Sequence, residues 1–148
     1  MQYRLYSFVA HHYLSPMQCG LQTAHVVSEM SRYANAIYSD WAENDKTIII
    51  CGAGNHAGVM EAFKQLRAHN NVLSYADVSE QLPLTLFLED EQSMNRMATA
   101  CGIVVPDRFF NAVWNSDQQC YTPADADAEV YTQIEHDFVT YLKSFRLA

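Results

Sequence analysis

The chain has 148 residues, of which 49% are hydrophobic and 18% charged, a composition typical of one folded domain. Its formal net charge is -8, and its Lys and Arg residues are scattered singly, which disfavours strong binding to nucleic-acid phosphates. The apolar runs are far shorter than the roughly 20 residues that cross a bilayer, and no secretory signal pattern occurs at the start. We therefore expect a soluble cytoplasmic protein without a membrane partner.

The cysteines and histidines do not form a recognisable metal or disulfide pattern. His11 and His12 are adjacent, and no third ligand stands at a recognisable spacing from them, so no metal site is predicted. The four cysteines are far apart and include no CxxC pair, which favours buried free thiols: Cys19, Cys51, Cys101 and Cys120.

Two strands and a long helix are predicted in the first third of the chain. Residues 2–10, rich in Tyr, Phe and Val, indicate a strand. Residues 17–43 show an apolar stripe at spacings of three and four, which predicts one long amphipathic helix. Residues 47–51 then form an almost uninterrupted apolar run, typical of a strand covered on both faces.

The middle of the chain predicts a second helix and two further strands. Val59, Phe63 and Leu66 mark an amphipathic helix that fades near residue 70, and residues 72–75 are a candidate extended segment. The stretches LPLTLFLED (82–90) and CGIVVPD (101–107) predict strands, with EQSMNRMATA (91–100) as a candidate short helix between them. This order predicts an α/β fold with a small mixed four-stranded sheet flanked by helices.

A C-terminal extension, residues 107–148, follows this core of residues 1–106 within one predicted domain. Thr122 is a suitable N-cap and Pro123 fits the first helical position, so a helix is expected at about 123–146. Its apolar stripe must pack either on the body of the protein or on a second subunit.

Three glycines follow the strand at 47–51. Gly52, Gly54 and Gly58 stand between a strand and a helix, in a loose likeness of a dinucleotide fingerprint. The preferred interpretation is a tight turn that needs positive φ, with Asn55 as the helix N-cap. Two alternatives remain open: free N–H groups at Gly54, Asn55 and His56 that hold a substrate anion, or a mononucleotide bound at Gly52–Gly58.

The stretch LSPMQCGLQTAHVVSEM, residues 14–30, resembles the opening of type 2 peptidyl-tRNA hydrolases, in which a loop leads into a helix bearing a Gln-x-x-His pair. That pair corresponds to Gln22 and His25. The later strands LTLFLED and MATACGIVVP are similar to the two adjacent final strands of the family. The resemblance implies a four-stranded mixed sheet flanked by helices, a frequent homodimer, and hydrolysis of peptidyl-tRNA.

The sequence departs from the family at its catalytic positions. Gln18 stands where the resemblance implies a catalytic lysine, and a glutamine cannot supply a cation to the developing negative charge of an ester. The Asp-Ala-Gly-x-Thr element is missing, although Asp90 and Thr99 stand near the positions of its Asp and Thr. The acidic charge of the chain also disfavours tRNA as a partner.

Four polar residues recur on one face of the first predicted helix. Gln18, Gln22, His25 and Glu29 are spaced by four, three and four residues, and Glu29 is placed to orient His25 as a base. The alternative is a solvated face with an ordinary ion pair. In the functional interpretation, Gln22, His25, Asp90 and Thr99 form a catalytic or binding face at the carboxyl edge of the sheet.

These observations lead to three functional hypotheses. The first is a divergent type 2 peptidyl-tRNA hydrolase-like domain, expected to be a homodimer, that binds a ligand or performs an altered hydrolysis without the standard lysine. The second is retained peptidyl-tRNA hydrolysis, and the third is mononucleotide binding at the glycine turn. No cofactor is expected.

Overall fold

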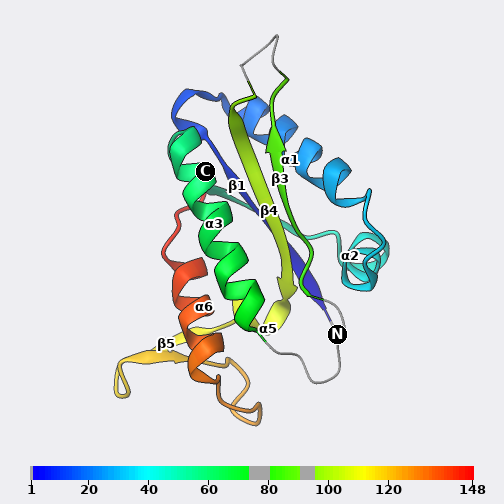
Figure 1. Ribbon diagram of the computed structural model, residues 1–148. Helices are drawn as coiled ribbons and strands as arrows, with labels where there is room; N and C mark the ends of the chain where they lie inside the picture. Colours follow the sequence, from blue (N-terminus) through cyan, green and yellow to red (C-terminus); the bar gives the residue numbers. More distant parts are fainter. Residues whose placement is uncertain (1, 74–80, 91–95) are drawn as a thin grey trace.

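One mixed sheet forms the centre of the protein. The computed structural model describes residues 2–73, 81–90 and 96–148. The sheet has the order β2-β1-β4-β3 (Figure 1), with strands at Tyr3–Val9 (β1), Ile48–Gly52 (β2), Leu84–Leu88 (β3) and Ala98–Pro106 (β4). β1 is parallel to β2, whereas β4 is antiparallel to both β1 and β3. The predicted small mixed sheet of an α/β fold is thus confirmed.

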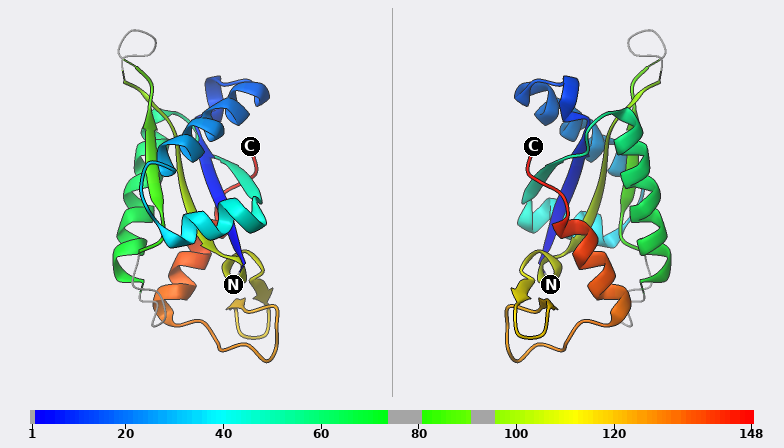
Figure 2. Two further views of the ribbon diagram at one scale, coloured as in Figure 1. Left: turned by 90° about the vertical axis from the view of Figure 1, so that its right-hand side faces the viewer. Right: turned by 90° about the vertical axis from the view of Figure 1, so that its left-hand side faces the viewer.

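Helices cover both faces of this sheet (Figure 2). Helix α1 (Pro16–Met30) packs on one face, and α3 (His56–Val72) and α6 (Gln133–Lys143) pack on the other. The alternation of β1 explains this division, because successive side chains point to opposite faces. Ser7 contacts Thr23 of α1 with 2.7 Å between their hydroxyl oxygens, whereas Phe8 packs edge-on against Phe145 after α6.

The predicted helix over 17–43 is two helices rather than one. α1 ends at Met30, and a short α2 (Ala36–Asp40) then leads into a π-helical turn, η2 (Trp41–Asp45). The side chain of Asn35 caps α2 by accepting a hydrogen bond from the Tyr38 N–H (3.0 Å). The break lets Ile37 and Trp41 reach the core, whereas Ala34, between the two helices, is exposed.

Two other expectations from the middle of the chain are corrected. Val72 belongs to α3, so the segment predicted to be extended at 72–75 begins in a helix; residues 74 and 75 lie outside the described residues. Residues 98–100 of the helix expected at 91–100 belong to β4, whereas residues 91–95 lie outside the described residues. β4 is buried along its whole length, and its small residues at 98–100 allow the close packing of a central strand.

The C-terminal extension contains a hairpin before its helix. A short helix α5 (Asp107–Phe110) leads to the paired strands β5 (Val113–Asn115) and β6 (Cys120–Thr122). The helix expected at 123–146 is shorter, Gln133–Lys143, because its N-cap is Thr132 and not Thr122. Thr132 and Glu135 form a capping box, in which each side chain accepts a hydrogen bond from the backbone N–H of the other. α6 packs on the body of the same chain, where Phe138 meets Phe109.

Three of the four cysteines are buried free thiols, as predicted, and Cys120 is half-buried. Burial raises the pKa of Cys51 to about 11, so this thiol stays protonated at neutral pH. None of the described helices combines the length and apolarity that a bilayer crossing requires.

Candidate functional site

Apart from Glu29, in the last turn of α1, the polar residues singled out in the sequence gather toward one end of the sheet. The parallel strands β1 and β2 both finish there, as does β3, and the first turns of α1 and α3 begin there (Figure 1). Ligand sites in open α/β sheets lie outside the carboxyl ends of strands, so this end is the natural place for a site.

A bulge in β4 turns Thr99 toward α1. Phe87 pairs with Ala100 and Leu88 with Ala98, which leaves Thr99 without a partner in the β3–β4 register. If side chains alternated strictly along β4, Thr99 would lie on the same face of the sheet as Cys101. The thiol of Cys101 lies 3.8 Å from the backbone carbonyl oxygen of Val59 in α3, so that face is the one covered by α3. The hydroxyl of Thr99 instead lies 3.3 Å from Oε1 of Gln22. A bulge re-aims a side chain in this manner, and such bulges are common beside functional sites.

The Thr99 hydroxyl links an amide and a carboxylate. It lies 3.3 Å from Oε1 of Gln22 and also 3.3 Å from Oε1 of Glu89. Thr99 is fully buried, Gln22 is 7% exposed, and Glu89 is half-buried. Glu89 was not predicted as a site residue, although the period of two along β3 places it on the same face as Phe87. We call Gln22, His25, Glu89 and Thr99 the polar face.

His25 is held by a ring and not by a carboxylate. Its imidazole stacks on Phe87 with ring centroids 4.5 Å apart and planes within 7° of parallel. Glu29, expected to orient His25, instead forms an ion pair with Arg32 at 3.1 Å. The stack fixes the plane of the imidazole, and the expected Glu29–His25 pair is replaced by a surface pair within α1.

Asp90 lies one residue beyond the carboxylate that contacts Thr99. Asp90 is exposed, and its backbone carbonyl accepts a hydrogen bond from the N–H of Arg96 (3.3 Å), where the chain returns toward β4. The structure therefore brings Gln22 and Thr99 into contact, with His25 one helical turn further along α1, and places Asp90 at the rim. Its catalytic role stays a prediction.

Gln18 has a structural task at the start of α1. The Ser15 N–H donates to Oε1 of Gln18 at 2.8 Å, and the Gln18 N–H donates to Oγ of Ser15 at 3.2 Å. These two bonds form a capping box, which satisfies donors that a helix start leaves unpaired. The side chain of Gln18 is thus turned back on its own helix.

The glycine turn matches its preferred interpretation. Gly54 has a φ of +83°, and Asn55 caps α3 by accepting a hydrogen bond from the Gly58 N–H at 2.9 Å. The Gly54 N–H donates to Nδ1 of His11 at 3.3 Å, and the Gly54 carbonyl accepts from the His12 N–H at 3.2 Å. The donors of Gly54 and Gly58 therefore have partners within the chain, which weakens the case for a phosphate cradle.

The other two glycines are explained by close contacts. A Cβ on Gly52 would lie 2.5 Å from Nδ1 of His11, and a Cβ on Gly58 would overlap the carbonyl oxygen of Ala53. His11 and His12 lie edge to face, 4.6 Å between ring centroids. Throughout the described ranges, no three His, Cys, Asp or Glu side chains converge on a possible metal position.

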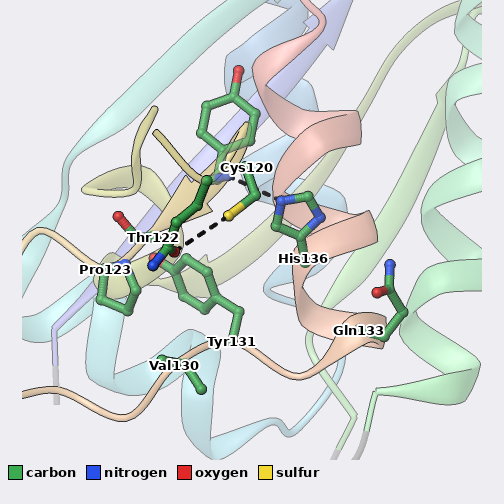
Figure 3. A pocket seen from close by; sticks show the side chains of 9 residues that line it. Cys120, Thr122, Pro123, Val130, Tyr131, Gln133 and His136 are labelled. Atoms are coloured by element: carbon green, nitrogen blue, oxygen red, sulfur yellow. Dashed lines mark hydrogen bonds between the residues drawn. The ribbon is translucent and has the colours of Figure 1, made fainter. Parts of the chain in front are cut away.

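A separate hollow of about 300 Å³ lies at the opposite end of the molecule, between β6 and the first turns of α6 (Figure 3). It contains both Cys120 and His136, residue types that form nucleophile–base pairs in cysteine enzymes. Here, however, Nε2 of His136 accepts the N–H of Tyr121 at 3.0 Å, and the Cys120 thiol faces Oε1 of Gln118 at 3.8 Å. These two bonds occupy the groups that a Cys–His pair would need, so the hollow shows no activated thiol.

No known family model matches this chain, and no curated protein matches it. The candidate site therefore depends on its geometry and on the residues themselves.

Proposed function

We propose that this chain is a divergent type 2 peptidyl-tRNA hydrolase-like domain that binds an acyl ligand at the polar face and lacks the family's lysine-assisted hydrolysis. The arrangement of elements supports the proposal in outline. The first strand leads through a short loop to the helix that bears Gln22 and His25, and the last two strands of the sheet are adjacent. The resemblance implies both features.

The commitment of Gln18 to the cap of α1 is the observation that carries the proposal. Ester hydrolysis develops negative charge on the carbonyl oxygen, and removal of one electrostatic donor typically costs about 10²- to 10³-fold in rate. Among the described residues, no Lys or Arg side chain forms a hydrogen bond or ion pair with Gln22, Glu89 or Thr99. The Glu89 carboxylate also opposes negative charge beside it, so this face favours binding over rapid turnover.

A combined assay tests the proposal. We expect the wild-type protein to release no peptide from peptidyl-tRNA above the protein-free control. We also expect N-acetylphenylalaninamide, an acyl probe, to shift the side-chain amide resonance of Gln22 in NMR spectra. Thr99→Val keeps the shape of the side chain and removes its hydroxyl, so it should weaken the binding of the probe. Thr140→Val, on the exposed face of α6, is the matched control and should not.

Retained hydrolysis is the competing hypothesis for the same face, and it is favoured by the contact between Thr99 and Gln22 beside His25. Efficient peptide release by the wild type that is lost in His25→Ala would support it and contradict our proposal. The mononucleotide hypothesis makes a different prediction, namely a thermal shift with nucleotides that Gly54→Val abolishes. We expect no such shift, because the turn uses the N–H groups of Gly54 and Gly58 internally.

A further inference from the structure

One edge of the central sheet is covered by the chain itself, and the other is open. Residues 146–148 lie along β2, where the Ala148 N–H donates to the Ile50 carbonyl at 2.9 Å. β3 forms the opposite edge (Figure 1), and β4 is its only strand partner among the described residues. An open edge presents a row of backbone donors and acceptors, which is a template for another strand.

The hydrogen bonds at the two ends of β3 show which of its backbone groups face outward. The β4 side of the sheet bonds to the Pro83 carbonyl at 3.0 Å and to the Glu89 N–H at 2.9 Å, so the odd-numbered residues face β4. Bonding groups alternate along an antiparallel strand, so the N–H and C=O groups of Leu84, Leu86 and Leu88 face away from β4. Within the described ranges, these outward groups have no hydrogen-bond partner.

A side chain closes the start of this edge. Asn70 of α3 is buried, and its Oδ1 accepts from the Leu82 N–H at 3.2 Å while its Nδ2 donates to the Leu82 carbonyl at 2.8 Å. The amide thus acts as one residue of a neighbouring strand, and the edge is open from Leu84 onward. The strand LTLFL contains neither Lys nor Pro, the residues with which natural edge strands block association.

We propose that β3 pairs antiparallel with β3 of a second copy of this chain, about a two-fold axis at Leu86. Leu86 of one protomer then exchanges both backbone hydrogen bonds with Leu86 of its partner, and Leu84 does so with the partner's Leu88. The outward-facing residues are self-complementary because they are spaced equally on either side of Leu86, as an isologous interface requires. The two sheets join into one continuous sheet.

The side chains of β3 suit this register. Residues directly opposite each other in antiparallel strands lie on the same face of the sheet and pack together. On the face covered by α3, Leu84 meets the partner's Leu88, which is 36% exposed in the single chain and becomes covered. On the face covered by α1, Phe87 meets the partner's Thr85, an aromatic and β-branched pair of the kind that stabilises sheets.

Charge complementarity favours a second copy in this orientation. β3 itself is uncharged, and the carboxylates of Glu89 and Asp90 follow its last residue. The start of β3 lies beside the ends of α1 and α3, which carry the exposed cations Arg32 and Arg67. Arg32 forms a surface pair with Glu29, and a pair of this exposed kind is weak. Antiparallel pairing therefore brings the acidic end of each β3 to the basic end of the other.

Sedimentation velocity on the wild type and a matched pair of variants tests this interface. We expect a monomer–dimer equilibrium for the wild type. Leu88→Lys removes both Leu84–Leu88 pairs and adds charge to the edge, so it should raise the dimer dissociation constant about tenfold or more. Ile48→Lys makes the same kind of change at the opposite edge, where Ile48 is 42% exposed, and should leave the dissociation constant unchanged.

Hydrogen exchange followed by NMR locates the interface on the wild type alone. The amides of Leu84, Leu86 and Leu88 should exchange slowly in concentrated protein and faster on dilution, because they are bonded only in the dimer. A wild type that stays monomeric at NMR concentrations overturns the proposal, whether the edge serves another partner or none. A dimer whose three amides exchange at the same rates at all concentrations also overturns it. The wild-type measurements decide the matter even if Leu88→Lys fails to fold.

Discussion

Gly58 lies in the first turn of α3, directly above the backbone of the turn that precedes it. A Cβ at this position would overlap the carbonyl oxygen of Ala53, a backbone atom that cannot move without displacing the start of the helix. Gly20 in α1 has the opposite surroundings, because a Cβ there would meet no heavy atom within 4 Å. The two glycines are both helical, so contact alone distinguishes them.

We expect Gly58→Ala to lower the free energy of unfolding by about 2–3 kcal/mol, since overpacking against the backbone is costly. Gly20→Ala should raise it by about 0.5–1 kcal/mol, because alanine loses less backbone entropy in a helix. Urea unfolding followed by circular dichroism measures both values. Equal effects of the two substitutions would contradict the assigned contacts.

The sequence predicts some residue roles and not others. Positive φ at Gly54 and the capping by Asn55 follow from local turn chemistry, which the sequence carries directly. The contact of Gly52 with His11 depends on how two distant segments meet, so no local pattern reports it. Glu89 was missed for a similar reason, because its importance depends on a bulge that turns Thr99 from one face of the sheet to the other.

Helices α3 and α6 pack on the same face of the sheet and meet through aromatic rings. The imidazole of His69 lies near the rings of Phe138 and Tyr141, with centroids 5.5 Å and 5.3 Å away. Burial lowers the pKa of His69 below its ordinary value, and the carboxylate of Asp137 opposes part of this shift. The folded protein therefore prefers neutral His69.

This preference predicts a pH dependence of stability. Unfolded histidine has a pKa of about 6.5, so the unfolded chain takes up this proton first as the pH falls. The stabilisation is complete above about pH 6.5 and is lost as the pH falls through the lower pKa of the folded state. Urea unfolding at about pH 7.5 and about pH 5.5 should show a smaller decrease for His69→Gln than for the wild type. Identical decreases would contradict a role for His69 in this packing.

Element boundaries were the least predictable part of the fold. Thr122 and Thr132 both fit an N-cap, and the sequence around Thr122 also offers a proline at the first helical position. The structure uses Thr132 because residues 120–122 pair with β5 as the second strand of a hairpin. Similarly, the apolar stripe over 17–43 crosses Asn35, whose capping bond starts a separate helix. In both places a tertiary or capping interaction overrides a continuous local pattern.

The last three residues of the sequence lie along an edge of the central sheet. Residues 146–148 lie antiparallel along β2: the Gly52 N–H donates to the Arg146 carbonyl and the Ala148 N–H donates to the Ile50 carbonyl, both at 2.9 Å. β2 is an edge strand, and an unpaired edge is a template for association with another chain. This segment therefore protects the sheet as well as stabilising it.

Removal of residues 146–148 should expose this edge. We expect the shortened protein to lose about 1–2 kcal/mol of unfolding free energy, since two backbone hydrogen bonds disappear, and to self-associate in sedimentation velocity experiments. A variant with both Arg146→Ala and Leu147→Ala keeps the backbone bonds and should retain the association state of the wild type. A shortened protein that behaves like the wild type would show that the segment does not protect β2.

The general architecture could be predicted because the apolar runs of the strands and the apolar stripes of the helices indicate the same fold. Four apolar strands, with helical patterns after the first and after the second, predict a mixed sheet covered by helices. The polar face was predictable in part, since Gln22, His25 and Thr99 were named from spacing and resemblance. The capping role of Gln18 has a local signal that the functional interpretation passed over, because Ser15 and Gln18 have the S-x-x-Q spacing of a capping box with Pro16 at the first helical position.

If, as we propose, the start of α1 lacks the cation that hydrolysis of peptidyl-tRNA needs, Gln18→Lys should supply it, and the rate of peptide release from peptidyl-tRNA is the measurement that shows this. The control is Met17→Lys, which adds the same charge at the neighbouring position, where the side chain is 86% exposed. We predict that Gln18→Lys releases peptide about 10²- to 10³-fold faster than the wild type, whereas Met17→Lys stays at the wild-type rate. Rapid release by the unmodified protein, or equal rates for the two lysine variants, would contradict the claim.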